Sequence, residues 1–315
     1  MTRNNTRTSV ETGILTGLLV ILGAFIGYGI PLLNVFASLT GPVVMAVIGF
    51  RHGLKWSFLS AVITIVLLML TIGPAEAVFH GFTFASVGIP LGETFRRRWS
   101  VVKILTIPSI VYALTICILV IGVSKILGYN MYEIWLSAQE KALDMIQNYY
   151  AMAGASTEQV QMMVHNGELA LSILKKGIIA ILVITSFVQT FITASIMEFV
   201  CRRLGTPVVK IPPVSKWRMP EWSVHVYLLS VILMFGAKEI PFLESLGYNL
   251  AWLGGIMLLI QGLACMWTIL SEYTENRILK SIAMLILYSV SQITVVIGML
   301  DLAWNIRKYW VKKDI

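Results

Sequence analysis

The chain has 315 residues, of which 57% are hydrophobic and only 13% are charged, and its mean hydropathy is +0.81. Charged residues make up about 25% of an average soluble domain, so this composition excludes an ordinary soluble globular protein. A net charge of +8 could indicate nucleic-acid binding, but Lys and Arg cluster between apolar runs, as topology signals of membrane proteins do. We therefore expect an all-α, polytopic transmembrane helical bundle that embeds in a lipid bilayer and binds no nucleic acid.

Apolar runs of about 18 to 20 residues recur along the chain, and this length crosses a hydrocarbon core of about 30 Å. Turn residues separate the runs, as Gly73 and Pro74 do after the third. In chain order, the predicted spans are residues 13–28, 35–50, 58–72, 75–95, 104–121, 177–200, 225–235 and 250–270. A last apolar block, residues 278–306, brings the predicted total to about eight to ten membrane helices.

Basic residues after alternate spans predict the orientation. They lie near the N-terminus, at Arg51 and Lys55, in residues 96–98 and in residues 202–218. The positive-inside rule places these segments in the cytoplasm. We therefore expect a multi-pass protein of the bacterial cell (inner) membrane with a cytoplasmic N-terminus.

The longest predicted stretch outside the membrane is residues 127–176, which parity places on the outer side. Apolar residues between positions 138 and 149 share one helical face, and Gly154 interrupts that helix. Ser156 and Gln159 have the spacing of a capping box that starts a second helix. This pattern predicts an extracytoplasmic amphipathic helical hairpin that lies on the interface or caps the bundle, or alternatively forms a lid over a cavity. The predicted division is then a five-span half (1–126), this insert (127–176) and a C-terminal membrane half (177–315).

The last apolar block has two possible forms. It is long for one upright helix and short for two, and Ser289, Ser291 and Gln292 interrupt it near the middle. One long tilted helix would place the basic residues after Asn305 outside, whereas a hairpin that turns at residues 289–292 keeps both ends in the cytoplasm. The sequence favours the hairpin but leaves the single crossing open.

A series of short motifs resembles the YybS-like family of predicted bacterial membrane proteins, a domain-of-unknown-function family. The motifs are PLL at 31–33, GFRHG at 49–53, GIPLGETFRRR at 88–98, CRRLG at 201–205, WRMPEW at 217–222, IQGLACM at 260–266 and GMLDLAWNIRK at 298–308. Family membership implies a membrane protein but no particular reaction. The layout of the N-terminal half is also distantly similar to the S components of energy-coupling-factor transporters, and this similarity implies binding of a micronutrient.

No enzyme motif is present: the chain has no H-E-x-x-H, no G-x-S-x-G and no P-loop. We therefore expect no enzymatic activity, and powered transport would need a separate ATPase. Cysteine and histidine do not cluster at metal-ligand spacing, so we predict neither a metal site nor a cofactor.

Ionisable residues at membrane depth are costly and tend to mark functional sites. Glu76 and His80 are four residues apart, so they share a helix face with Thr83. They form either a local hydrogen bond at a helix start or the polar wall of an outward-facing substrate pocket. Four residues at similar predicted depth could join that pocket: Tyr28, Asn34, Asn249 and Trp252. Glu93, Glu198 and Asp301 lie beside basic residues, and we expect ion pairs there.

Gly13 and Gly17 align small residues on one face of the first span, as do Gly23 and Gly27. Such a face allows close packing within the chain or docking of a partner. The S-component resemblance implies that Gly13 and Gly17 contact a membrane coupling subunit. Three function hypotheses follow: a substrate-binding transport subunit with a small-molecule ligand, a scaffold or regulator that binds protein partners, and a membrane enzyme acting on a lipid.

Overall fold

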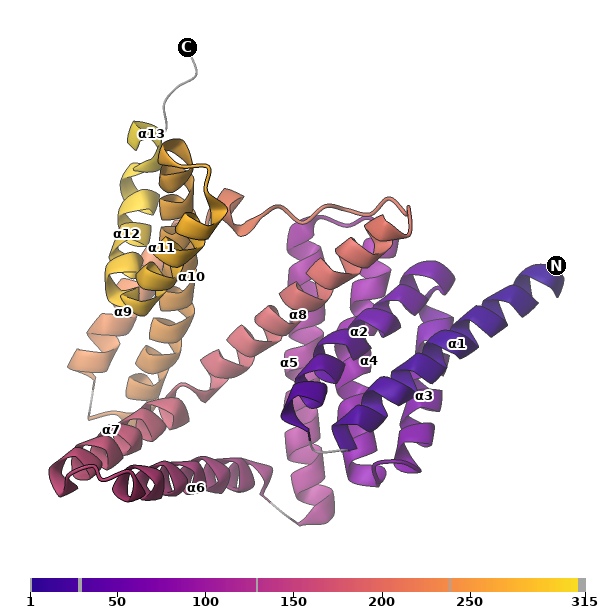
Figure 1. The fold of residues 1–315 in the computed structure, drawn as a ribbon, viewed down its shortest axis with the longest axis horizontal. Coiled ribbons are helices and arrows are strands. Elements are labelled where there is room, and N and C mark those ends of the chain that lie inside the picture. The colour runs from indigo at the N-terminus through magenta and orange to yellow at the C-terminus, as the bar shows by residue number, and fades with distance from the viewer. Residues whose placement is uncertain (1, 28–29, 129, 238, 311–315) are drawn as a thin grey trace. The chain divides into compact units, whose positions relative to one another are not determined.

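A computed structural model describes residues 2–27, 30–128, 130–237 and 239–310. Within these ranges the regular structure is helical and contains no strand (Figure 1). Among the described residues, five helices are long and apolar enough to cross a membrane, or six when a bent helix pair is taken as one span. The predicted all-α membrane bundle is therefore confirmed.

The chain forms two compact units. The first contains Met1–Lys141 and Leu182–Ile211, and the second contains Ala142–Ile181 and Pro212–Ile315. The helices that lie within the first unit are α1 (Thr2–Gly27), α2 (Pro31–His52), α3 (Leu54–Met69), α4 (Pro74–Arg96) and α5 (Val101–Leu127). Those within the second are α7 (Thr157–Lys176), a 3-10 turn (Val214–Lys216), α9 (Trp222–Gly236), α10 (Pro241–Tyr273), α11 (Arg277–Ser289), α12 (Ser291–Trp304) and α13 (Arg307–Trp310). Two helices contribute residues to both units: α6 (Met131–Met152) and α8 (Ile178–Arg203). The predicted boundaries at residues 126 and 176 stay a prediction.

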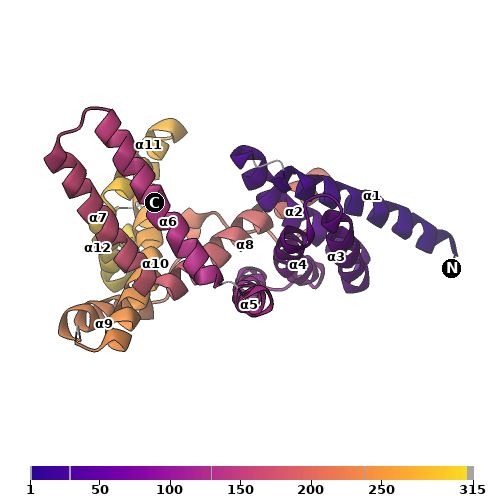
Figure 2. The same cartoon turned by 90° about the horizontal axis from the view of Figure 1, so that it is seen from below.

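Helix α4 is the centre of the first unit, where it packs against α2, α3 and α5. Figure 2 shows α4 between α3 and α5, with α2 crossing it. Glycines make the crossing with α2 close, because a Cβ added at Gly88 would lie 2.7 Å from the Pro42 carbonyl oxygen. A Cβ at Gly92 would lie 2.5 Å from the carbonyl oxygen of Ala46. Gly88 and Gly92 are one turn apart, so this interface is a small-x-x-x-small contact between two helices of the same chain.

A tight turn separates α2 from α3. Gly53 has a φ of 88°, a left-handed backbone value that favours glycine, and its N–H donates to the Gly49 carbonyl at 2.9 Å. Beside this turn, Arg51 forms an ion pair with Glu11 of α1 at 2.6 Å. The interruption in the apolar sequence at Arg51 and His52 therefore lies at a helix end.

Helix α10 is the centre of the second unit, and its two faces pack against α9 and α12. On one face, a Cβ at Gly254 would lie 3.2 Å from the backbone nitrogen of Tyr227 in α9. On the other, Gly298 of α12 packs directly against the Leu258 carbonyl, and Gly262 of α10 packs against the Thr294 carbonyl. The α10–α12 crossing is thus reciprocal, with a glycine contributed by each helix.

The last apolar block breaks at Val290, inside the predicted 289–292 segment, and α11 and α12 meet there at 102°. Both ends of the pair lie beside the last turns of α10. At the start of α11, the Lys280 ammonium lies 3.2 Å from the Ser271 hydroxyl. After α12, Arg307 donates to the carbonyl of Ser215, which also accepts from Thr268. The pair therefore enters and leaves at the same end of α10, and the choice between the predicted hairpin and a single crossing stays a prediction.

The predicted helical hairpin is also present. The Ser156 hydroxyl accepts from the Gln159 N–H at 3.2 Å, while the Gln159 carboxamide accepts from the Ser156 N–H at 3.0 Å. Gly154, with a φ of 83°, lies in the turn between α6 and α7. The capping box and the glycine interruption are both confirmed.

Candidate functional site

A small cavity in the first unit is lined by polar groups from four helices. Ser38 comes from α2, His80 and Thr83 from α4, Tyr112 from α5 and Gln189 from α8. The apolar part of the wall consists of Pro42, Phe79 and Phe84. The cavity volume is about 90 Å³, which is room for several water molecules or for a solute of a few heavy atoms. Pockets for drug-sized ligands are larger, about 300–1,000 Å³.

Hydrogen bonds fix part of the cavity wall and leave the rest available. Gln189 Nε2 donates to the Ser38 carbonyl at 2.9 Å, which ties α8 to α2. The Thr83 hydroxyl donates to the His80 carbonyl at 2.8 Å. In the part of the chain that the structure describes, the His80 ring nitrogens and the Tyr112 hydroxyl have no hydrogen-bond partner. These two side chains can therefore donate to or accept from a polar molecule in the cavity.

The predicted pocket residues of the first unit take different positions. His80 and Thr83 line the cavity, and Asn34 lies next to it, because its Oδ1 accepts from the Ser38 hydroxyl at 3.3 Å. Glu76 is exposed at the start of α4, and among the described contacts no hydrogen bond joins it to His80. Tyr28 lies outside the described residues.

Sequence reasoning missed Ser38, Tyr112 and Gln189. Each lies in an apolar run among scattered Ser and Thr residues. Scattered polar residues of this kind carry no periodic pattern, and only the packing of α2, α5 and α8 brings these three to one place. These three residues can therefore be recognised as parts of one site only from the packing of the helices.

The other two predicted pocket residues belong to the second unit. Asn249 is 9% exposed, and its amide group donates to the carbonyls of Lys176 and Ser245 at 2.7 and 2.8 Å. Its Oδ1 accepts from the Ala180 N–H at 2.7 Å. Trp252 lies at the same junction, since a Cβ added at Gly177 would be 3.7 Å from its indole nitrogen. These contacts give Asn249 and Trp252 a structural role, because they join the start of α8 to α10.

The two glycine pairs of α1 differ in what surrounds them. No described atom lies within 4 Å of a Cβ added at Gly13 or Gly17, whereas Gly23 packs against the Leu68 side chain at 2.7 Å. Neighbouring Ile14 and Leu18 are exposed. The Gly13–Gly17 face of α1 is therefore open, and Gly23 serves packing within the chain.

The expected ion pairs are confirmed at all three acidic residues. Glu93 contacts Arg97 at 2.5 Å and Arg96 at 3.2 Å, and Glu198 contacts Arg202 at 3.5 Å. Glu198 also accepts from the Ile211 N–H at 2.9 Å. The third residue, Asp301, belongs to a larger network.

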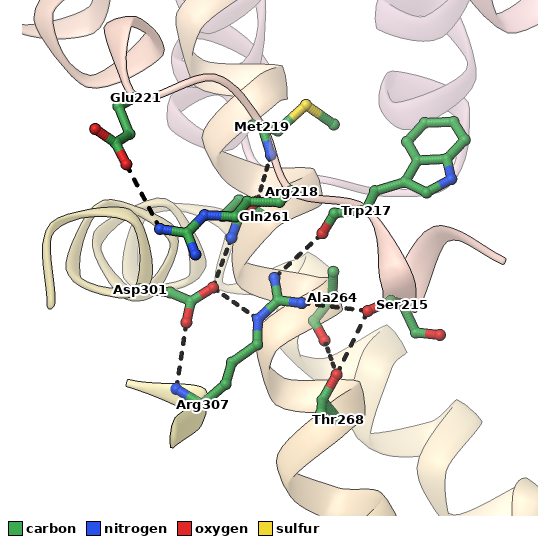
Figure 3. Close-up of polar contacts among 10 residues, drawn as sticks. All are labelled: Ser215, Trp217, Arg218, Met219, Glu221, Gln261, Ala264, Thr268, Asp301 and Arg307. Atoms are coloured by element: carbon green, nitrogen blue, oxygen red, sulfur yellow. Dashed lines mark hydrogen bonds and ion pairs between the residues drawn. The ribbon is translucent and has the colours of Figure 1, made fainter. Parts of the chain in front are cut away.

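Asp301 is the centre of a buried polar network in the second unit (Figure 3). It is 2% exposed and accepts from Arg307 Nε at 2.7 Å and from Gln261 Nε2 at 2.6 Å. The Gln261 carboxamide oxygen then accepts from the Met219 N–H at 2.8 Å, and Arg307 donates to the carbonyls of Ser215 and Trp217 at 3.3 and 3.4 Å. This network, Asp301–Gln261–Arg307, connects α10 and α12 to residues 207–220, the Pro-rich segment before α9.

The described residues contain no group of three or more His, Cys, Asp or Glu side chains that could hold a metal ion. The candidate sites are therefore the polar cavity, the open glycine face and the buried network. Of these, only the polar cavity offers enclosed space to a small molecule.

Comparison with known proteins gives a match over residues 17–302 to the family described as "Predicted membrane protein (DUF2232)". The chain belongs to this family. The matched range contains the residues that line the polar cavity, together with Gly17 and Asp301, whereas Gly13 and Arg307 lie outside it. The chain is also 22% identical over 309 residues to the uncharacterized protein YybS of Bacillus subtilis (strain 168), covering 96% of this chain and 98% of that protein. No solved structure matches this DUF2232 chain.

Proposed function

We propose that this membrane protein is a substrate-binding subunit of a bacterial inner-membrane transporter, similar in role to an energy-coupling-factor S component. The observation that carries the proposal is the cavity in which polar side chains from α2, α4, α5 and α8 converge inside an apolar helical unit. The His80 ring and the Tyr112 hydroxyl, both on partly buried side chains that line the cavity, are free to hydrogen-bond with a polar ligand. The proposed activity is binding, without catalysis.

The size of the cavity constrains the ligand. At about 90 Å³, it suits a small polar micronutrient, and a vitamin-sized ligand requires the cavity to widen. Gln189 is the only cavity residue from α8, and one hydrogen bond to Ser38 holds it to α2. Movement of α8 relative to α2 would therefore enlarge the site.

Transport requires partners in this proposal. The open Gly13–Gly17 face docks a membrane coupling subunit, and a separate ATPase supplies the energy. The N-terminus and the basic turns lie in the cytoplasm, following the distribution of Lys and Arg. Gly17→Leu should then block association with the coupling subunit by bulk alone and leave ligand binding unchanged.

Ligand binding is tested by purifying the detergent-solubilised full chain and identifying co-purifying small molecules by mass spectrometry. We expect a small polar molecule with the native protein, and at least about tenfold less of it with His80→Ala or Gln189→Ala, because one lost hydrogen bond costs about 1.5 kcal/mol. The matched control is Thr40→Ala, since the Thr40 hydroxyl donates to the Phe36 carbonyl and does not line the cavity. Glu76→Ala should weaken binding less than His80→Ala does. Equal occupancy in native protein and His80→Ala would refute the proposal.

A scaffold that binds protein partners is the second candidate. It is favoured by the apolar surface of the hairpin, where Met145, Tyr149, Met152 and Met162 are each at least 68% exposed. Flexible methionines suit adaptable protein contacts. A native protein that carries no small molecule but retains a protein subunit through purification, and loses it on Tyr149→Ser, would favour the scaffold.

A further inference from the structure

The first unit contains a second, larger cavity, which is a groove along α4. Helices α3 and α5 each pack along α4, which lies between them in Figure 2. The groove between them has a volume of about 540 Å³. Its floor includes the small residues Ala61, Ala85 and Ser86, and its rim includes the larger Phe58 and Phe82. The small side chains of α3 and α4 leave space between the larger ones that line the groove.

The groove has the length of one lipid acyl chain. Its lining follows α4 from Phe82 to Glu93, and eleven steps of an α-helix rise about 16 Å. One leaflet contributes about half of the hydrocarbon core of roughly 30 Å. An acyl chain that enters at the Glu93 end would therefore reach the Phe82 end near the middle of the bilayer.

The Glu93 end of the groove is basic. Four basic residues follow Glu93 at the end of α4, in the turn after it and at the start of α5: Arg96, Arg97, Arg98 and Lys103. Glu93 pairs with two of these cations, and Arg98 and Lys103 are exposed. Four cations against one carboxylate leave a net positive charge beside the mouth of an apolar groove.

Trp99 lines the groove at the same end. The Arg97 guanidinium lies 5.7 Å and the Lys103 ammonium 5.8 Å from the centre of its ring. Tryptophan side chains prefer the depth of lipid headgroups, and basic residues there attract anionic ones. The length of the apolar groove, the positive charge at its mouth and the tryptophan there all suit a lipid with an anionic headgroup.

We propose that this groove binds one anionic phospholipid of the surrounding bilayer. One acyl chain lies along α4 between Phe58 and Val111, and the phosphate contacts Arg98 and Lys103. The site is distinct from the polar cavity, so it stands whether or not the protein is a transport subunit.

Native mass spectrometry tests the proposal on the detergent-solubilised full chain incubated with equal amounts of phosphatidylglycerol and phosphatidylcholine of matched acyl chains. We expect one retained phosphatidylglycerol per protein, with at least fivefold preference over phosphatidylcholine. Val62→Phe, which fills the groove from an exposed lining position, should reduce retention of both lipids at least fivefold. Its control is Leu67→Phe, an exposed position of the same helix outside the lining, which should retain the native level.

Charge is tested separately. Arg98→Gln with Lys103→Gln should remove the preference for phosphatidylglycerol while phosphatidylcholine retention is unchanged. The control pair, Arg203→Gln with Lys210→Gln, removes two exposed cations of the same unit outside the groove and should keep the preference. Only variants with the melting temperature and elution volume of the native protein are compared.

Fluorescence gives an independent test. Phospholipids with acyl chains brominated near the headgroup should quench the tryptophan fluorescence of the native protein more than that of Trp99→Phe, because Trp99 lines the groove. No preference in native protein, equal retention in Val62→Phe and Leu67→Phe, or no Trp99-dependent quenching would overturn the proposal.

Discussion

Asp301 and Arg307 form an ion pair that is largely removed from solvent, with side-chain exposures of 2% and 18%. Removing one partner of a buried pair leaves the other charge without compensation, whereas replacing both is often tolerated. Loss of Asp301 would also remove an acceptor of Gln261, and loss of Arg307 would remove a donor to the carbonyls of Ser215 and Trp217. Stability of this part of the second unit should therefore depend on the pair as a unit.

We predict that Asp301→Ala lowers the stability of the purified protein by about 3 kcal/mol. Adding Arg307→Met to it should recover part of that loss, because no unpaired guanidinium remains. Melting temperature in detergent measures both effects, with exposed Lys308→Met as the control. Strictly additive losses in the double variant would show that the two side chains are not coupled.

Sequence reasoning found the charged residues of this network more readily than its neutral members. Asp301 and Arg307 were expected to pair because an acidic residue near a membrane boundary precedes basic ones. Gln261, 1% exposed in α10, connects Asp301 to the Met219 backbone, and the sequence shows it only as part of the IQGLACM motif, without a role. A neutral amide in an apolar run becomes informative only after the neighbouring helix is placed beside it.

Close helix crossings determine the packing of each unit at the scale of elements. Gly88 and Gly92 allow α4 to approach the backbone of α2, and Gly262 and Gly298 do the same for α10 and α12. A larger side chain at these positions would meet backbone atoms, which cannot move aside without separating the helices. The open Gly13–Gly17 face has no such constraint within the chain.

We therefore predict opposite outcomes for two Gly→Leu substitutions. Gly92→Leu should destabilise the protein by about 3 kcal/mol or more, because overpacking here presses on the Ala46 carbonyl. Gly13→Leu should leave melting temperature unchanged or raise it, since leucine favours a helix by nearly 1 kcal/mol over glycine. Thermal unfolding of the two purified variants gives the comparison. Similar losses in both would mean that α1 packs on this face as well.

The sequence predicts the ends of helices where glycine or a capping residue is present. Gly53 and Gly73 lie at helix boundaries with positive φ, and Ser156 caps α7 through the expected box. The Gly88-x-x-x-Gly92 signal is present in the sequence but does not reveal which helix α4 contacts. Local chemistry therefore predicts where helices end, and shape complementarity between helices decides which of them meet.

Orientation in the membrane is a property of the whole molecule. Alternating basic segments predict residues 127–176 outside and residues 202–218 inside. Labelling with a membrane-impermeant thiol reagent tests this after Cys117, Cys201 and Cys265 are replaced by alanine or serine. A cysteine at Ser156 should react in intact cells and one at Ser215 only after lysis; the reverse pattern would invert the topology.

The bent α11–α12 pair makes a separate prediction. Arg307 binds the carbonyls of Ser215 and Trp217, so the C-terminal end and the Pro-rich segment should lie on the same side of the membrane. A reporter protein fused after Ile315 and one inserted after Lys210 should both be active on the same side of the membrane. A C-terminal reporter active only outside, with the other active inside, would show that residues 278–306 cross the bilayer once.

The order in which the ribosome makes the chain has a consequence for the polar cavity. The first unit consists of Met1–Lys141 and Leu182–Ile211, and its last helix, α8, ends at Arg203, 76 residues after α5 ends at Leu127. At about 5–20 residues per second, synthesis of this interval lasts roughly 4–15 s. During that time Ser38, His80 and Tyr112 are already in the nascent bundle, but Gln189 is not, and their polar groups face lipid or the insertion machinery. A nascent chain arrested before residue 182 should therefore be a preferred client of membrane chaperones, and release beyond residue 211 should end that association.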